Sequence, residues 1–359
     1  MEELFDGKEI WDESIAIKEV RKMEMIITTT IKDINENEWE ILTGNNSAEQ
    51  SYGWFRTVED SDMVKMHYVF LRENKELTAA ACCFLSEKRI FNLEIPLLAV
   101  GSPLGTSHAF FCKTPEQADL LLEGLEQIQK REKAKGTVIL FLDEGFNFRQ
   151  MQGFVSLPMP DDTYIDVNFV DFNGYLASLK YKSRRSVKNT LKRTEKLGVK
   201  TVFTNEFSQW KDVARTLQGY LCEKHKDYEW YLTEKFYESL EKNFKDKAEL
   251  LMFFKDDIPL ASILALNLPE VAHYRFAGAD PHYKQYQGYF LIYYEGIKRA
   301  LEKKQKRVYF GLTTYEFKEK IGCKRKPLYE LVKMENPLLN AALKSYATFS
   351  EIVNIDFLR

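Results

Sequence analysis

The order of hydrophobic and polar positions predicts a mixed α/β protein. Short apolar runs bounded by turn residues predict strands, and two pairs of them predict hairpins. The first hairpin joins residues 65–72 to 76–85, and the second joins 249–254 to 260–266. Further strands are expected at 25–30, 137–142, 164–169, 199–203, 273–277, 307–310 and 328–334.

Apolar residues spaced three or four positions apart predict helices between these strands. One helix covers 115–133, with Thr114 as its N-cap before Pro115. A long basic helix covers 172–196 and ends at Gly198. Helices are also expected at 207–225, 233–242 and 285–304.

The two halves of the chain repeat one order of elements: strand, helices, β-meander, helix, strand. This repetition favours a duplicated α/β unit, although no exact sequence repeat is present. Proline and aspartate cluster at Pro158–Asp162, a composition typical of a connection. We therefore expect two tandem domains, residues 1–163 and 164–359, each with a mixed central sheet flanked by helices.

Composition narrows the class of protein. The chain has 359 residues, 45% of them hydrophobic, so it can fill two cores and is not disordered over most of its length. No apolar run reaches the roughly 18–20 residues that span a bilayer, and the acidic start lacks the pattern of a secretory signal. Five cysteines without CxxC spacing argue against a disulfide framework and a Cys-rich zinc site. We expect a reduced, cytoplasmic protein with no metal, no tightly bound cofactor and no membrane insertion.

The net charge of −3 hides local asymmetry. Residues 1–62 carry a balance of −10, whereas residues 180–200 and 298–326 each carry +8. A total charge near zero argues against a general DNA binder. The two basic stretches still allow an anionic ligand, such as a phosphorylated cofactor or the end of an RNA, and two solvated helix faces are the simpler alternative.

Common catalytic signatures are missing: the chain has no GxGxxG, Walker A, GxSxG or HExxH sequence. The segment 273–334 is more informative. A strand is followed by a turn that holds Gln285, Tyr286, Gln287 and Gly288, and then by a helix. Free N–H groups at a helix N-terminus bind anions, and a glycine lets a phosphate approach closely. An ordinary turn and N-cap is the alternative.

This segment resembles the GNAT acyltransferase superfamily. Its phosphate loop, [QR]-x-x-G-x-[GA], is matched by Gln285 and Gly288, with Phe290 where a small residue is usual. The superfamily's closing motif resembles Y-E-K-x-G-F-[KR]. This chain matches it at Glu319, Lys320, Gly322 and Lys324. Lys318 stands where many members carry the tyrosine that protonates the leaving thiolate.

With this lysine, the segment resembles a subgroup of the superfamily, the FemABX-like transferases, which are built from two tandem GNAT-like domains. Phe317, Lys318 and Gly322 are similar to the group's F-K-x-x-[FL]-G element. The basic helix is similar to the segment that opens the group's second domain. It begins with Arg184, Val187 and Lys188 and ends with Lys196, Gly198 and Val199. CelD-like acetyltransferases carry similar stretches. The resemblance covers about residues 45–340 and implies a bacterial enzyme.

The resemblance implies a role for several residues. Lys318 would polarise the acyl carbonyl or neutralise developing negative charge, and the turn at Gln285–Gly288 would hold a pyrophosphate. From their side chains alone, Arg184 and Arg185 are candidates for clamping a phosphate or carboxylate, and a salt bridge to the acidic N-terminal part is the alternative. Tyr315 is a candidate acid or hydrogen-bond donor, and a place in an amphipathic core is the alternative. Asp280, His273, Glu229 and Glu295 are candidates for the base that takes the amine proton.

Three functions remain open at this stage. The first is an N-acyltransferase that moves an acyl group from acyl-CoA to the primary amine of a small molecule or cell-envelope precursor. The second, close behind, is an aminoacyltransferase that uses aminoacyl-tRNA, as FemABX members do when they build peptidoglycan cross-bridges. The third is a non-catalytic GNAT-like binding module. No feature of the sequence specifies the acceptor amine or the oligomeric state.

Overall fold

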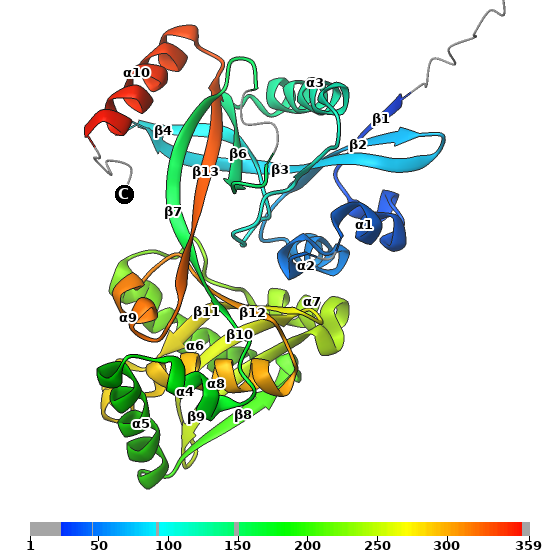
Figure 1. The fold of residues 1–359 in the computed structure, drawn as a ribbon. Helices are drawn as coiled ribbons and strands as arrows, with labels where there is room; N and C mark the ends of the chain where they lie inside the picture. Colours follow the sequence, from blue (N-terminus) through cyan, green and yellow to red (C-terminus); the bar gives the residue numbers. More distant parts are fainter. Residues whose placement is uncertain (1–22, 45, 91–92, 147–150, 354–359) are drawn as a thin grey trace, which may run out of the picture.

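The computed structural model describes residues 23–353, apart from 45, 91–92 and 147–150. Its first half forms one α/β unit, drawn in blue to green at the top of Figure 1. The elements of this first unit are β1 (Met23–Thr28), α1 (Glu36–Thr43), α2 (Tyr52–Ser61), β2 (Met66–Glu73), β3 (Glu76–Ile90), β4 (Leu93–Val100), β5 (Phe110–Phe111), α3 (Pro115–Glu132) and β6 (Gly136–Leu142).

A second unit repeats this order. It is preceded by β7 (Val155–Asp166), α4 (Phe172–Ser178) and α5 (Tyr181–Lys196). It continues with β8 (Val199–Thr204), α6 (Phe207–His225), α7 (Glu234–Phe244), β9 (Ala248–Lys255), β10 (Ile258–Asn267), β11 (Val271–Ala279), α8 (Gly288–Glu302), β12 (Arg307–Gly311) and α9 (Tyr315–Lys320). The last two described elements are β13 (Lys324–Met334), which runs between the units, and α10 (Pro337–Val353), which lies with the first unit (Figure 1). The repetition confirms the expected duplication of an α/β unit.

The described strands form one continuous sheet in the order β1-β2-β3-β4-β6-β13-β7-β12-β11-β10-β9-β8, with β5 paired to β3. Within each unit the neighbours are antiparallel except for one pair, β4 with β6 and β11 with β12. The two long strands β7 and β13 pair with each other and run between the units, as Figure 1 shows. Strand β13 adds to the first unit through β6, and β7 adds to the second through β12.

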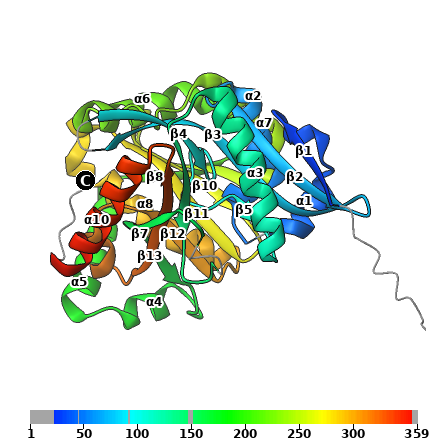
Figure 2. The same ribbon diagram turned by 90° about the horizontal axis from the view of Figure 1, so that it is seen from above.

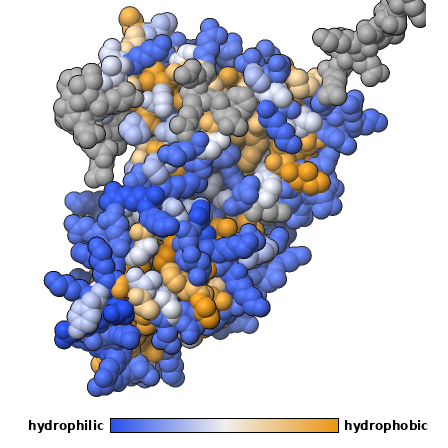
Figure 3. Space-filling model, in the orientation of Figure 1, coloured by the Kyte–Doolittle hydropathy of each residue, from blue (hydrophilic) through white to orange (hydrophobic). Residues whose placement is uncertain are grey.

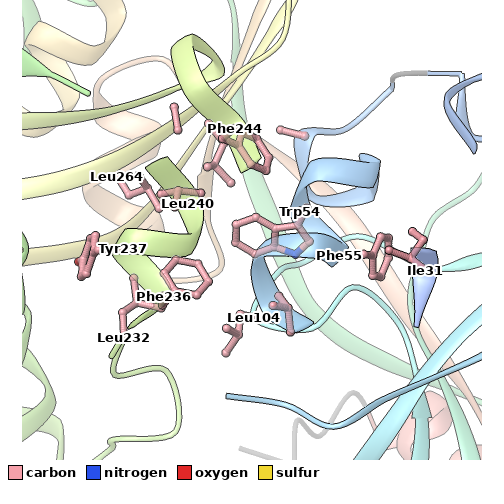
Figure 4. Close-up of a cluster of buried hydrophobic side chains, with 14 of the residues drawn as sticks. Ile31, Trp54, Phe55, Leu104, Leu232, Phe236, Tyr237, Leu240, Phe244 and Leu264 are labelled. Carbon is pink, nitrogen blue, oxygen red and sulfur yellow. The ribbon is translucent and has the colours of Figure 1, made fainter. Parts of the chain in front are cut away.

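Helices cover the sheet on both sides and create separate cores. In the first unit α3 crosses β2 and β3, as Figure 2 shows from above. A second core lies between α4, α5, α8 and the strands of the second unit. A third joins the two units, where Trp54 of α2 lies edge-on to Phe236 and Phe244 of α7 (Figure 4). This shared core holds the units together.

Three expectations about the elements are wrong. The helix expected over 172–196 is broken, because Leu179 has an extended backbone and packs its side chain into the core beside Gly322. The helix expected from residue 285 begins at Gly288, because Gln287 has a left-handed φ of 57°. The strand expected at 164–169 is β7, which begins at Val155 and includes both prolines of the expected connection.

The expected elements end with the strand at 328–334, whereas the structure continues with α10, which packs Leu343 against β7 and β13. The expected boundary between residues 163 and 164 falls inside β7. The division into domains 1–163 and 164–359 stays a prediction.

Candidate functional site

The N-terminus of α8 is open. Gln287 occupies the N-cap position, but its side chain makes no capping hydrogen bond to the helix. Its Oε1 atom is buried and has no hydrogen-bond partner in the described structure. A short 3₁₀ helix, Pro281–Tyr286, leads into this turn and includes Gln285 and Tyr286. The turn expected to hold a phosphate is therefore a helix end without a side-chain cap, and its binding of a phosphate stays a prediction.

Gly288 has a structural reason to be glycine. A Cβ atom at this position would stand 3.1 Å from the Leu260 Cβ atom and 3.2 Å from the Ala261 Cβ atom, both in β10. The missing side chain thus lets α8 pack closely on the sheet. Only the backbone N–H of Gly288 is available to a ligand, and its contact with a phosphate stays a prediction.

Helix α9 packs against α8 and so places Lys318 close to this turn. Phe317 packs against Phe290 and Tyr293 of α8, with ring centroids 5.1 and 5.0 Å away. The neighbouring Lys318 is 1% exposed, and its Nζ atom donates to the backbone oxygens of Phe310 and Gly311 at 2.8 and 2.9 Å. The fold therefore brings together two motifs that lie about thirty positions apart in the sequence.

The environment of Lys318 limits its protonation. Burial lowers the pKa of its ammonium group to about 8, although the nearby carboxylate of Asp162 opposes that effect. An ammonium group has three N–H donors, and the two carbonyl oxygens use two of them. The protonated form keeps a third donor for a developing oxyanion or a leaving group, and the neutral form does not.

The other candidates have local partners. Asp280 caps the 3₁₀ helix through the backbone N–H and ring of His282, and Tyr315 donates its hydroxyl to the backbone oxygen of Asp161. Arg184 donates to the Ala177 carbonyl in α4, and Arg185 is exposed. Their catalytic or binding roles stay predictions. Cys323 is buried, and burial raises the pKa of its thiol to about 12.

A cavity of about 640 Å³ lies between the two units. It is lined by residues of both units, among them Ser47, Ser107, Asp162, His273, Tyr309 and Lys326. In β11 and β12, His273 and Tyr309 face this cavity, whereas the intervening Ala272, Tyr274 and Val308 belong to the core beneath α8. The cavity and α8 therefore lie on opposite faces of the same two strands.

A buried ion network supports the cavity wall. Arg275 of β11 donates its Nε–H to Glu49 at 2.7 Å and pairs with Asp162 of β7 at 3.3 Å. Burial raises the pKa of Glu49, but Arg275, His273 and the Thr106 N–H outweigh that effect and hold it below its ordinary value. Sequence reasoning did not single out Glu49, Arg275 or Asp162. Glu49 and Arg275 are separated by 226 positions, and no local motif marks either of them.

The two basic stretches differ once folded. In residues 298–326, nine cations pair with carboxylates: Lys298, Arg299, Lys303, Lys306, Arg307, Lys320, Lys324, Arg325 and Lys326. In residues 180–200, no ion pair forms within the described chain, and most of the cations are exposed along α5. Figure 3 shows a mostly hydrophilic surface where α5 lies in Figure 1. A cationic surface free for a ligand thus remains on α5 alone of these two stretches.

A known protein family matches residues 101–353, which is more than half of the chain. It is the FemAB-like family, described as peptidoglycan biosynthesis/recognition. The chain belongs to the FemAB-like family. This membership confirms the resemblance of the motifs. No curated protein matches the chain. No helix in the described part of this FemAB-like chain is long and apolar enough to cross a membrane.

Solved structures share the fold at low identity. FemX has a TM-score of 0.60 and 13% identity, over 87% of this chain and 98% of its own. The C-terminal domain of a putative lysylphosphatidylglycerol synthetase from Agrobacterium fabrum has a TM-score of 0.55 and 13% identity, over 88% and 95%. A tandem GNAT protein from the clavulanic acid biosynthesis pathway has a TM-score of 0.53 and 9% identity, over 88% and 99%. These likenesses confirm the expected fold of two tandem GNAT-like domains.

Proposed function

We propose that this FemAB-like protein is an N-acyltransferase that moves an acyl group from acyl-CoA to a primary amine. The acceptor is a small molecule or a cell-envelope precursor. The observation that carries the proposal is the contact of two elements in the second unit: the uncapped N-terminus of α8 and the buried Lys318 of α9. Phe317 holds them together. One offers N–H groups to a pyrophosphate, and the other offers positive charge near the reacting carbonyl.

The acceptor amine enters from the face of β11 and β12 that lies opposite α8. The ladder between β11 and β12 ends at the pair His273–Tyr309, and Phe310 and Gly311 follow with the carbonyls that bind Lys318. The cavity opens on the face opposite α8, so an amine held there meets the donor where the two strands separate. The amine nitrogen bonds to the acyl carbon and loses a proton, the carbon–sulfur bond breaks, and the leaving thiolate takes up that proton. Orientation and charge stabilisation lower the barrier, and no covalent enzyme intermediate is needed.

Aminoacyl-tRNA is the second candidate donor. The unpaired cations of α5 favour it, because a row of exposed lysine and arginine side chains suits a phosphate backbone. Helix α5 also packs against α8, the helix whose N-terminus is the proposed donor site. In this case a carbon–oxygen bond breaks and Lys318 neutralises the leaving alkoxide.

The test is a binding titration of the purified protein with CoA, acetyl-CoA and bulk tRNA at two salt concentrations. Binding of CoA species that changes little with salt supports the acyl-CoA reaction, and a screen of amines follows. Binding of tRNA that falls steeply with salt, without CoA binding, moves the donor to aminoacyl-tRNA. If neither donor binds, the transferase proposal fails and a non-catalytic binding module takes its place.

A further inference from the structure

His273 occupies a rigid place in the cavity wall. The residue is 3% exposed, and its ring stacks on that of Tyr309 in the neighbouring strand, with centroids 4.9 Å apart and planes 7° apart. The Nε2 atom lies 3.3 Å from the Ser47 Oγ atom. The Nδ1 atom is buried and has no hydrogen-bond partner in the described structure. A buried polar atom without a partner is costly and calls for a ligand or a functional reason.

A chain of hydroxyls connects this ring to a carboxylate. The Oγ atoms of Ser47 and Ser107 are 2.9 Å apart, and Ser107 Oγ lies 3.0 Å from Oε2 of Glu49. Arg275 pairs with Glu49, and the Thr106 N–H donates to its Oε2 atom at 2.7 Å. Because its pKa is held below the ordinary value, Glu49 is ionised near neutral pH and can only accept hydrogen bonds.

The direction of every hydrogen bond in this chain follows from counting hydrogens. Each serine hydroxyl carries one hydrogen. Ser107 spends its hydrogen on Glu49, so Ser47 must donate to Ser107, and Ser47 then accepts from His273. The Nε2 atom of His273 therefore carries the hydrogen, and Nδ1 carries a lone pair. Burial also lowers the pKa of His273 to about 4, which keeps the ring neutral near pH 7.

We propose that the Nδ1 atom of His273, fixed as an acceptor by the Ser47–Ser107–Glu49 chain, receives the N–H of the amine substrate when the amine displaces the groups that cover this atom in the cavity wall. This inference rests on the proposed function. As the amine nitrogen bonds to the acyl carbon, its N–H becomes acidic and the proton passes to Nδ1. The bond from the acyl carbon to sulfur or oxygen breaks, and the imidazolium returns the proton to that leaving atom. His273 is then a catalytic residue, and Ser47 is a positioning residue.

The first test reads the tautomer and needs no activity. The protein carries five histidines, so ¹⁵N-histidine labelling with long-range ¹H–¹⁵N correlation resolves each ring. Spectra of His273→Gln identify the His273 signals. We expect a neutral ring with hydrogen on Nε2 from pH 6 to 8, and a loss of that single tautomer in Ser47→Ala. His108, buried in the same cavity wall, is the internal reference and keeps its signals. Hydrogen on Nδ1, or a ring protonated at pH 7, would overturn the proposal.

The second test uses an amine probe without any donor. Nα-acetyl-L-lysine amide at millimolar concentration should shift the Nδ1 signal of His273 and leave the Nε2 signal nearly unchanged. An unchanged Nδ1 signal rejects the contact with the amine. This result is independent of the donor, so it separates failure of this inference from failure of the transferase proposal.

The third test applies once a donor is known. In His273→Gln the side-chain amide can still donate toward Ser47, but the acceptor at Nδ1 is gone. We expect kcat to fall by about 10²–10⁴-fold, the usual contribution of a positioned proton acceptor, and we expect a smaller fall in Ser47→Ala. A wild-type kcat in His273→Gln would remove His273 from the reaction.

Discussion

The two units share one topology but differ at the N-terminus of the equivalent helix, α3 in the first unit and α8 in the second. In the first unit, Thr114 and Gln117 form a capping box at the start of α3, and Pro115 has no N–H to offer. In the second unit, α8 begins after Gln287 in a left-handed conformation, and no side chain caps it. A closed helix end contributes stability, and an open end can bind an anion. The duplicated fold thus leaves one helix end uncapped, which is the proposed anion site, and caps its counterpart.

The connections that precede these helices also differ: the one before α3 is largely buried, and the one before α8 lies on the surface. After β4, the chain turns inward, where the indole of Trp54 donates to the Pro103 carbonyl and Ser102 donates to the Glu49 carbonyl. After β11, the chain forms a 3₁₀ helix on the surface, with His282 exposed. The first unit therefore folds this region back onto its own residues, whereas the second unit leaves it on the surface, where we propose that the donor binds.

Removing the charge next to the open helix end should have the largest effect. Lys318→Met keeps most of the side-chain volume but removes the third N–H donor, so we expect kcat/KM to fall by an amount equal to about 2–4 kcal/mol of barrier. Steady-state kinetics measures this loss. Lys333→Met, on the part of β13 that pairs with the first unit, is the control and should keep the rate. A wild-type rate in Lys318→Met excludes Lys318 from the mechanism.

The same lysine predicts opposite pH trends for rate and stability. Its folded pKa is about 8 and its ordinary value is 10.5, so the unfolded state binds more protons between these values. The free energy of unfolding should therefore rise with pH in that window, by at most about 3 kcal/mol relative to Lys318→Met. The rate should fall over the same window as the third donor is lost. Urea unfolding at pH 7.5 to 10.5 and a pH–rate profile check both trends, and parallel trends would contradict this assignment.

Closing the open end with a negative charge should weaken donor binding. Phe290→Glu places a carboxylate at an exposed position in the first turn of α8, where it interacts favourably with the helix dipole and repels a phosphate. Phe290→Gln, which loses the same ring contact with Phe317 but adds no charge, separates the two effects. We expect about tenfold weaker binding of the donor, or about 1.4 kcal/mol, by calorimetry. Glu116→Gln, in the first turn of α3, should leave that affinity unchanged. Equal losses in Phe290→Glu and Glu116→Gln would mean that the helix ends do not differ in function.

A smaller difference is expected between the two basic stretches, residues 180–200 and 298–326, in their contribution to RNA binding. Lys188→Gln combined with Lys192→Gln removes two unpaired cations of α5, and Lys306→Gln combined with Lys320→Gln removes two paired ones. If tRNA is the donor, the first pair should flatten the slope of log K against log salt by about 1–2. The second pair should change it little. Filter binding at several salt concentrations distinguishes them, and identical slopes would deny α5 a role in RNA binding.

The smallest effect is expected at the capped N-terminus of α3. Thr114→Ala removes the cap of α3 and should lower the free energy of unfolding by about 1 kcal/mol, measured by urea denaturation. The kinetic constants should stay at their wild-type values, since α3 lies outside the proposed donor site. A loss of activity without a loss of stability would mean that α3 also binds a substrate.

Local patterns predict what depends on near neighbours. The hairpins, the limits of α6 and the capped start of α3 follow from periodicity and turn residues, because these depend on contacts a few positions apart. The motifs around Gln285–Gly288 and Lys318 were also found in this way. The break at Leu179 was not, because it depends on a core contact with Gly322, far along the chain.

The α/β class, the duplication and the two motifs of the proposed donor site follow from the amino-acid sequence alone, since each depends on residues close together in the chain. Which of two equally charged stretches remains cationic depends on the folded structure, because distant carboxylates neutralise one of them. The cavity wall also depends on the folded structure. Ser47 and His273 meet across 226 positions, and the tautomer of His273 depends on a hydroxyl chain that exists only when the two units pack together.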